Sequence, residues 1–196
     1  EIMPSLVGSE MCIRDRYVNP MIGTDFTGNT YPGAQVPFGM VQLSPDNGLP
    51  GWDRISGYFY PDTTIAGFSH THLSGTGAGD LYDISFMPVT RPYKEAPAPL
   101  GIYSTFSHND EAASAGYYRV LLKDYNINVE LTATERCGIQ RYTFPEAEAS
   151  VFLNLKKAMN WDFTLDSKIE VVDSTTIRGY RLSQGWSPLQ HVISRP

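Results

Sequence analysis

The feature that most limits what this chain can fold into is a series of short β-strand patterns in its C-terminal half. Runs rich in β-branched and aromatic residues are separated by turns, and such residues favour pleated strands. Within 127–136, Val129 and Leu131 alternate with Glu130 and Thr132, which indicates a strand with one face in the core. We expect strands over 117–123, 127–136, 138–144, 150–156, 169–173, 175–183 and 189–194. Many short strands at close spacing predict an all-β fold, an antiparallel β-sandwich.

The N-terminal half is richer in Gly, Pro and Asn, so most of it reads as loop. We expect a strand over 36–43, demoted to an edge or irregular strand by its proline and glycine, and another over 81–89. The one helical signal is 107–115, where Ser107 can act as N-cap and Gly116 can end the helix. The expected fold is therefore an antiparallel sandwich with one short helix.

Composition excludes several classes of function. A formal charge of −6 without a basic stripe argues against a nucleic-acid partner. No run approaches the roughly twenty apolar residues of a membrane-spanning helix. Twelve Tyr, nine Phe and three Trp suit a β-rich domain and also suit carbohydrate, whose apolar C–H faces stack on flat rings.

The two ends of the chain differ from the rest. Residues 1–16 have neither the apolar region nor the cleavage site of a secretory signal, so we interpret them as a non-native leader. Cys12 lies in that leader, which leaves Cys137 as one free thiol. We expect residues 17–196 to form a single sandwich domain, truncated at its C-terminal end because the chain stops directly after a predicted strand.

The stretch from Gly67 to Asp80 carries the strongest local signal of a binding site. We expect a strand over 65–72, and a period of two would place His70 and His72 on the same face. Glycines 75, 77 and 79 follow, and they let a ligand approach bare backbone groups. This segment therefore predicts part of a pocket wall.

Other interpretations of the same residues remain open. A phosphate-binding loop would need Lys-Ser or Lys-Thr after the glycines, whereas Asp80 and Leu81 follow here. A zinc pair at His70 and His72 is possible, although no third ligand stands at a recognisable spacing. Both histidines could also be hydrogen-bonded core residues of a sandwich strand, which their spacing alone favours.

Trp52 and Asp53 form a second candidate. The pair could be an aromatic lid over the core, or a sugar platform with a hydroxyl acceptor beside it.

Long motifs, taken in order, resemble glycoside hydrolase family 92, the calcium-dependent exo-acting α-mannosidases. They are YVNPMIGTD, YPGAQVPFGMVQLSPD, SGYFYPDTTIAGFSHTHLSGTG followed by GDLYDI, GYYRVLLKDYNINVELTATER with GIQRYTFP, and GYRLSQGW. The resemblance covers essentially all of 17–196. Gln140 departs from it, standing where many relatives are expected to carry His, and this bears on packing more than on chemistry.

The resemblance implies the N-terminal β-sandwich domain, of the supersandwich type, of a two-domain enzyme whose (α/α)6-barrel domain is absent here. It implies inverting hydrolysis of terminal α-mannosides, with α-1,2 linkages in N-glycans as the expected substrate, by two carboxyl groups about 6.5–9.5 Å apart. Both carboxylates and most ligands of a Ca²⁺ ion would belong to the helical domain. This chain would hold no catalytic residue and would be inactive alone.

By the same resemblance the sandwich loops recognise a mannose-containing glycan and pack on the missing helical domain. The substrate-binding residues so implied are Trp52, Asp53, His70, His72, Ser74, Gly75, Thr76, Gly77 and Asp80, with the loop 28–33 close by. Relatives are expected in the bacterial periplasm or outside the cell. Two rival functions stay open: a stand-alone carbohydrate-binding module, and a metal-dependent hydrolase that uses His70 and His72.

Overall fold

The computed structural model describes residues 17–75, 77–96, 100–145, 148–156, 161–185 and 191–192. The expected leader and the last residues lie outside this part. Within it, regular structure is almost entirely antiparallel sheet. The strands are β1 (Ala34–Gln35), β2 (Gln42–Asp46), β3 (Thr64–Ile65), β4 (Gly67–Ser69), β5 (Ser85–Thr90), β6 (Ser104–Thr105), β7 (Glu111–Ser114), β8 (Tyr117–Leu122), β9 (Ile127–Ala133), β10 (Gly138–Thr143), β11 (Ala149–Asn154), β12 (Phe163–Val171), β13 (Ile177–Gln184) and β14 (His191–Val192).

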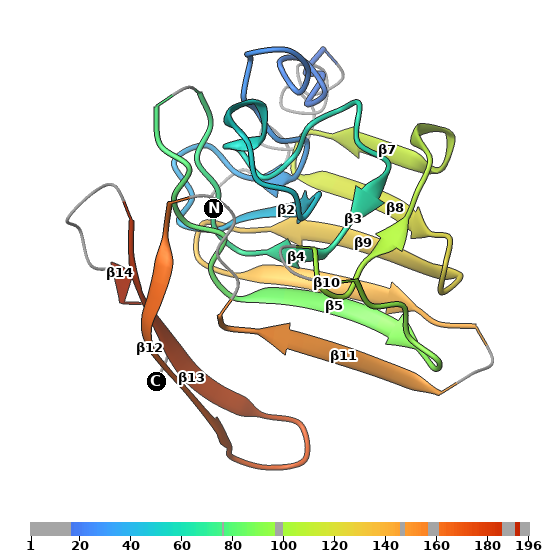
Figure 1. Cartoon of the computed structure of the whole chain (residues 1–196), viewed down its shortest axis with the longest axis vertical. Coiled ribbons are helices and arrows are strands. Elements are labelled where there is room, and N and C mark those ends of the chain that lie inside the picture. Colours follow the sequence, from blue (N-terminus) through green and yellow to red (C-terminus); the bar gives the residue numbers. More distant parts are fainter. Residues whose placement is uncertain are drawn as a thin grey trace, which may run out of the picture.

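Two sheets form the body of the molecule (Figure 1). One has the order β1-β2-β4-β5-β11 and the other has the order β10-β9-β8-β7. Their apolar side chains make one core, which joins Leu43 and Phe68 of the first sheet to Val120 and Val129 of the second. The predicted sandwich is confirmed.

Alternation along β8 and β9 explains how the second sheet contributes to this core. Tyr118, Val120 and Leu122 are buried, and in register they face Leu131, Val129 and Ile127 of β9. Burying each aliphatic side chain of this kind contributes about 1.5–3 kcal/mol. The intervening residues are less buried, as the sequence pattern predicts.

The predicted helix over 107–115 is wrong beyond its first turn. Ser107 does cap a short 3-10 turn, η2 (His108–Asp110), by accepting a hydrogen bond from the backbone of Asn109. The next residues are extended instead and form β7, which pairs with β8 from Glu111↔Val120 to Ser114↔Tyr117. Tertiary pairing overrides the local helical signal here. The other 3-10 turn in the described residues is η1 (Trp52–Arg54).

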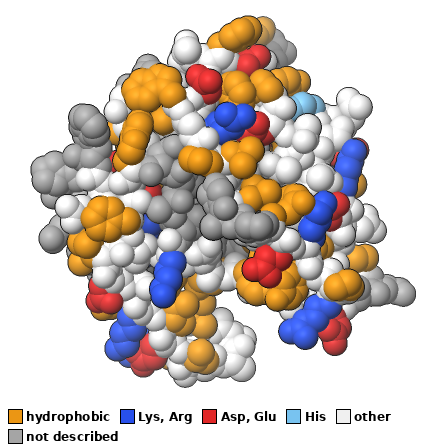
Figure 2. Space-filling model, viewed as in Figure 1, with side chains coloured by type: hydrophobic (Ala, Val, Ile, Leu, Met, Phe, Trp, Pro, Cys, Tyr) orange, Lys and Arg blue, Asp and Glu red, His pale blue; other side chains and the backbone are white. Residues whose placement is uncertain are grey.

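A long hairpin, β12–β13, extends away from the sandwich (Figure 1). Apolar side chains on it are exposed, among them Leu165, Ile169, Val171 and Ile177. In the same view, hydrophobic side chains stand among charged ones on this hairpin (Figure 2). An exposed row of this kind is a feature of surfaces that pack on another body.

In the described part of the chain we find no helix with the length and apolarity needed to cross a membrane.

Candidate functional site

The segment that carries the two histidines is less regular than the sequence predicts. The strand expected over 65–72 is interrupted at Ala66, and β4 ends at Ser69. Beyond it, the His70 N–H donates to Asp83 O at 3.0 Å and the Tyr82 N–H donates to Thr71 O at 3.0 Å. Because no regular strand continues through 70–72, the period-two argument for a shared face of the two imidazoles does not apply.

His72 lies inside the protein, with 3% of its surface exposed. Its Nδ1 lies 2.8 Å from Gln42 O, and its Nε2 lies 2.8 Å from Asp46 Oδ1 and 3.1 Å from Ser69 Oγ. Since a carbonyl oxygen only accepts, Nδ1 carries a proton. Both ring nitrogens are thus held by residues of the sandwich, and the ring lies in the interior rather than in the exposed loop that follows it.

His70 is partly exposed and has different surroundings. Its Nδ1 lies 3.0 Å from Ile84 O, and its ring meets Phe86 edge-on with 5.4 Å between centroids. The structure therefore gives the two imidazoles separate partners. In the described residues no three His, Cys, Asp or Glu side chains stand close enough together to hold a metal ion.

The loop after His72 is the exposed part of the motif. Ser74, Gly75 and Gly77 are exposed, while Thr76 lies outside the described residues. Gly75 and Gly77 have φ of +91° and +140°, and a Cβ built on either would meet nothing within 4 Å. The space above this backbone is open, so a ligand can come close to its N–H and C=O groups.

This loop is tied to a second loop from the N-terminal motif. The Gly75 N–H donates to Asn29 O at 2.6 Å, and Ser56 Oγ lies 3.1 Å from Thr30 O. The first contact links the histidine loop to the 28–33 loop, and the second links that loop to the residues following η1. The family resemblance implies that the 28–33 loop lies close to the other two segments, and these hydrogen bonds join all three.

Trp52 projects from η1 with 52% of its surface exposed. Next to it Asp53 is partly exposed, and Arg54 makes two 2.6 Å hydrogen bonds to the Asp62 carboxylate that fix the turn. Trp161, which is 42% exposed, lies against Trp52 with ring centroids 5.8 Å apart and planes at 58°. The two indoles form an aromatic wall beside the loops.

Trp161 was not among the residues that the sequence pointed to. The signal that could have found it is a repeated dipeptide, since Trp-Asp occurs at 52–53 and again at 161–162.

Asp80, at the end of the glycine loop, is buried at 6% exposure. Gly185 lies so close to it that an added Cβ would approach the Asp80 carboxyl oxygens to within 2.4 Å and 2.5 Å. The base of the β12–β13 hairpin therefore packs on the end of the loop. Asp80 supports the loop from inside, in contrast to Ser74 and Gly75.

A charged cluster anchors the same hairpin under the site. Arg181, buried to 1% exposure, donates to Asp83 Oδ1 at 2.5 Å and to Asp162 Oδ2 at 2.9 Å. Two carboxylates thus share one guanidinium. Burial raises the pKa of Asp162 to about 7, opposed by Arg181 and reinforced by Asp83 and Asp80.

The backbone beside this cluster is strained. Leu81, Tyr82 and Ile84 have φ of +83°, +63° and +57°, a region that costs a side-chain-bearing residue about 1–3 kcal/mol. The Tyr82 hydroxyl donates to Ile55 O, which holds the strained segment against the residues after η1. Strained backbone persists only where the surrounding contacts impose it. It is found most often at functional sites.

Comparison with known proteins places these features in a family. The sequence model of the glycosyl hydrolase family 92 N-terminal domain matches residues 17–193. A solved structure of a family GH92 α-mannosidase from Bacteroides thetaiotaomicron, in complex with mannoimidazole, is 42% identical with a TM-score of 0.84 over 91% of this chain. A family GH92 inverting mannosidase from the same organism is 30% identical with a TM-score of 0.66 over 84% of this chain.

A secreted glycosidase of Arthroderma benhamiae is 28% identical over 144 residues, which are 68% of this chain. The chain spans only part of each of these proteins: 24% of the first mannosidase, 22% of the second and 18% of the secreted glycosidase.

Proposed function

Since this chain belongs to glycosyl hydrolase family 92, through the N-terminal domain of that family, we propose that it is the sugar-recognising part of an inverting exo-α-mannosidase. The observation that carries the proposal is the assembly of two exposed features. They are the aromatic wall of Trp52 and Trp161 and the open backbone at Gly75 and Gly77, which a network of contacts holds beside the 28–33 loop. Flat rings and bare backbone groups suit the C–H faces and hydroxyls of a sugar.

The burial of the nine predicted residues divides them into two proposed roles. Trp52, Asp53, Ser74, Gly75 and Gly77 reach the surface and would contact sugar directly, and Thr76 is assigned with them by its place in the loop. His72 and Asp80 are buried and would position that loop from inside. His70 is partly exposed and its Nδ1 lies 3.0 Å from Ile84 O, so we assign it to neither role.

Hydrolysis itself needs two carboxyl groups with room for water between them. We assign these to the part of the protein that its relatives have and these 196 residues do not cover. The described residues bring together no three acidic or imidazole side chains for a metal ion. We assign most ligands of the proposed Ca²⁺ ion to that other part as well.

Two finer points extend the proposal. The substrate is an α-1,2-linked terminal mannose of a glycan such as an N-glycan, and the protein works outside the cytoplasm, in a periplasm or outside the cell. The description of one relative as a secreted glycosidase supports export. The exposed apolar residues of β12 and β13 would face the helical domain, which makes that domain the partner of this chain.

The test uses the natural full-length protein with α-1,2-mannobiose. We expect release of mannose that is initially the β-anomer, as inversion requires. Trp52→Ala should lower kcat/KM about tenfold or more, because loss of about 1.4 kcal/mol of transition-state binding is a tenfold effect. Ile139→Ala is the matched control, since Ile139 is 59% exposed but lies on β10, in the sheet that does not carry these loops. Equal activity of the two variants would remove Trp52 from the site.

The rival function is a carbohydrate-binding module without hydrolysis. An exposed indole pair on a β-sandwich would serve that role as well. Binding of mannoside by the full-length protein without any release of mannose would favour the module.

A further inference from the structure

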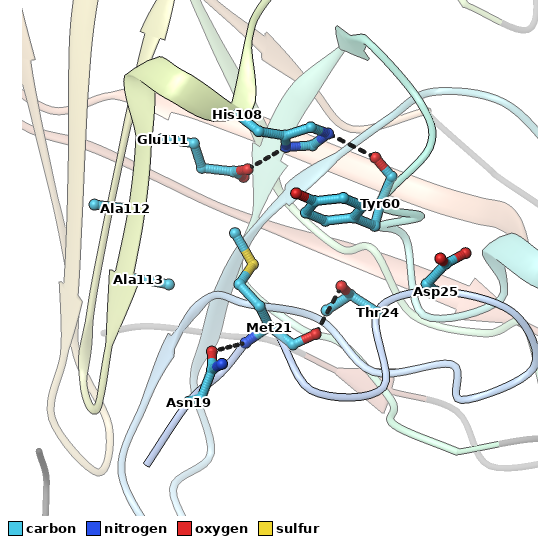
Figure 3. Close-up of a pocket in the computed structure, with 9 residues that line it drawn as sticks. All are labelled: Asn19, Met21, Thr24, Asp25, Tyr60, His108, Glu111, Ala112 and Ala113. Carbon is cyan, nitrogen blue, oxygen red and sulfur yellow. Dashed lines mark hydrogen bonds and ion pairs between the residues drawn. The ribbon is translucent and has the colours of Figure 1, made fainter. Parts of the chain in front are cut away.

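A cavity lies apart from the predicted site residues, between the loop Asn19–Asp25, Tyr60, η2 and β7 (Figure 3). Its volume is about 500 Å³, within the range of about 300–1,000 Å³ typical of small-molecule sites. None of the nine predicted residues is among the described residues that line it. β7 is the last strand of its sheet, so the cavity sits at the margin of the sandwich.

The wall formed by Glu111 is rigid. Its side chain is fully buried, and its carboxylate accepts hydrogen bonds from Tyr118 OH at 2.5 Å and from Tyr58 OH at 3.0 Å. Burial, with help from this carboxylate, raises the pKa of both phenols, so both remain protonated donors. On its other oxygen Glu111 faces His108 Nδ1 at 2.7 Å.

His108 in turn holds an aromatic platform in place. Its Nε2 lies 2.7 Å from Tyr60 O, and the imidazole stacks on the Tyr60 ring with 4.0 Å between centroids and 9° between planes. Tyr60 keeps 38% of its surface exposed. Figure 3 shows this ring between His108 and the loop that carries Met21 and Thr24. One face of Tyr60 is therefore covered, and the rest of the ring is available to the cavity.

Polar groups stand on either side of the platform. Asp25 Oδ1 accepts from the Phe26 N–H at 2.7 Å and Asn19 Oδ1 accepts from the Met21 N–H at 3.0 Å. The other carboxylate oxygen of Asp25 and the amide nitrogen of Asn19 have no hydrogen-bond partner among the described residues. One accepts and the other donates, which matches hydroxyl groups, since a hydroxyl does both.

Charge narrows the choice of ligand. The nine described lining residues include no Lys or Arg, and the imidazole of His108 is engaged by Glu111. An anionic ligand would meet the Asp25 carboxylate without a compensating cation, so phosphates and acidic sugars are disfavoured. What remains is a neutral, polyhydroxylated ring with an apolar face.

We propose that this cavity is a second carbohydrate site, which binds one neutral pyranose unit of a glycan against Tyr60, with Asp25 and Asn19 bonded to its hydroxyls. It holds a glycan chain at a place separate from the first proposed sugar site, which is formed by Trp52, Trp161 and the loop at Gly75. It therefore adds affinity for polymeric substrate and takes no part in cleavage.

The experiment measures retention of the natural full-length protein in gels that contain α-mannan. All variants carry Trp52→Ala, which weakens the first site. We expect the Trp52→Ala protein to be retarded by mannan, and Tyr60→Ala added to it to weaken the affinity about tenfold. Tyr60→Phe keeps the ring and should bind as the parent does. Asp25→Asn keeps the acceptor for Phe26 and should bind about threefold more weakly.

The outcomes are separable. Absence of retardation in the Trp52→Ala protein, or equal retardation of the Tyr60→Ala and Tyr60→Phe variants at unchanged melting temperature, overturns the second site. If Tyr60→Ala does not fold, Asp25→Asn decides, and unchanged affinity there also overturns it. With Trp52 intact, Tyr60→Ala should leave hydrolysis of a small aryl α-mannoside unchanged. Mannose release by the wild-type protein tests the proposed function by itself, whatever the gels show.

Discussion

The His72–Asp46 pair and the His108–Glu111 pair have nearly the same length, with 2.8 Å from His72 Nε2 to Asp46 and 2.7 Å from His108 Nδ1 to Glu111. Their surroundings differ. Both side chains of the first pair are fully buried, whereas the His108 side chain is 28% exposed at the edge of a cavity. A histidine paired with a carboxylate therefore supports a loop from inside the core in one place and borders an open pocket in the other.

The partners of the two carboxylates differ as well. Asp46 Oδ1 faces His72, and its Oδ2 is buried without a hydrogen-bond partner among the described residues. Glu111 is contacted by two phenols in addition to His108. Asp46 thus depends on one imidazole, while Glu111 has two further donors. A histidine in a motif is for this reason a weak guide to ligand contact until its burial and its partners are known.

The largest effect we predict comes from breaking the fully buried pair. His72→Ala leaves Asp46 as a buried carboxylate without a counterpart, and removal of one partner of such a pair typically costs about 3–5 kcal/mol. The free energy of unfolding, from urea denaturation of the chain, measures this loss. The double variant His72→Ala with Asp46→Ala should recover part of it, because no buried charge remains. A double variant less stable than the single one would contradict the interpretation.

The next effect is a pH dependence at the cluster of Arg181, Asp83 and Asp162, where two carboxylates face one cation and Asp80 lies nearby. The pKa of Asp162 is about 7 in the folded chain and near 3.8 when unfolded, so between these values the folded state holds more protons. Stability should therefore fall by about 3–4 kcal/mol as the pH rises from 4 to 7, and level off above about pH 8.

Asp162→Asn is the control for this pH effect, since an amide does not titrate. The difference in unfolding free energy between wild type and variant, followed from pH 4 to 8, isolates Asp162 from the other carboxylates. Parallel curves for the two proteins would mean that Asp162 adds no pH dependence, and they would contradict its raised pKa.

Local sequence patterns predicted the parts of the fold that depend on neighbouring residues. The alternation along β9 is visible in the sequence because a strand's period of two needs no distant partner. The capping serine at 107 likewise predicted a real turn. The helix beyond that turn was wrong because β7 is stabilised by pairing with β8 and by the phenols that contact Glu111, and neither can be read from residues 107–115.

The candidate site shows the same limit. Sequence motifs identified Trp52 and the loop residues Ser74, Gly75 and Gly77, which are exposed, and these remain predicted sugar contacts. They did not reveal that His72 is held by Asp46 and Gln42, which lie 26 and 30 residues away. Trp161 was missed for the same reason, because only the folded chain brings it to Trp52.

The smallest loss of stability should come from breaking the partly exposed pair, His108–Glu111. His108→Ala removes one donor from Glu111, but Tyr58 and Tyr118 still donate to the carboxylate, and water can enter from the cavity. We expect a loss of about 1.5 kcal/mol in the same urea experiment, the low end of the range for one hydrogen bond to a charged group, because water can replace the lost donor. His108→Ala should therefore cost less than half of what His72→Ala costs. Equal losses would mean that the cavity is closed to water and that the two pairs serve the same structural role.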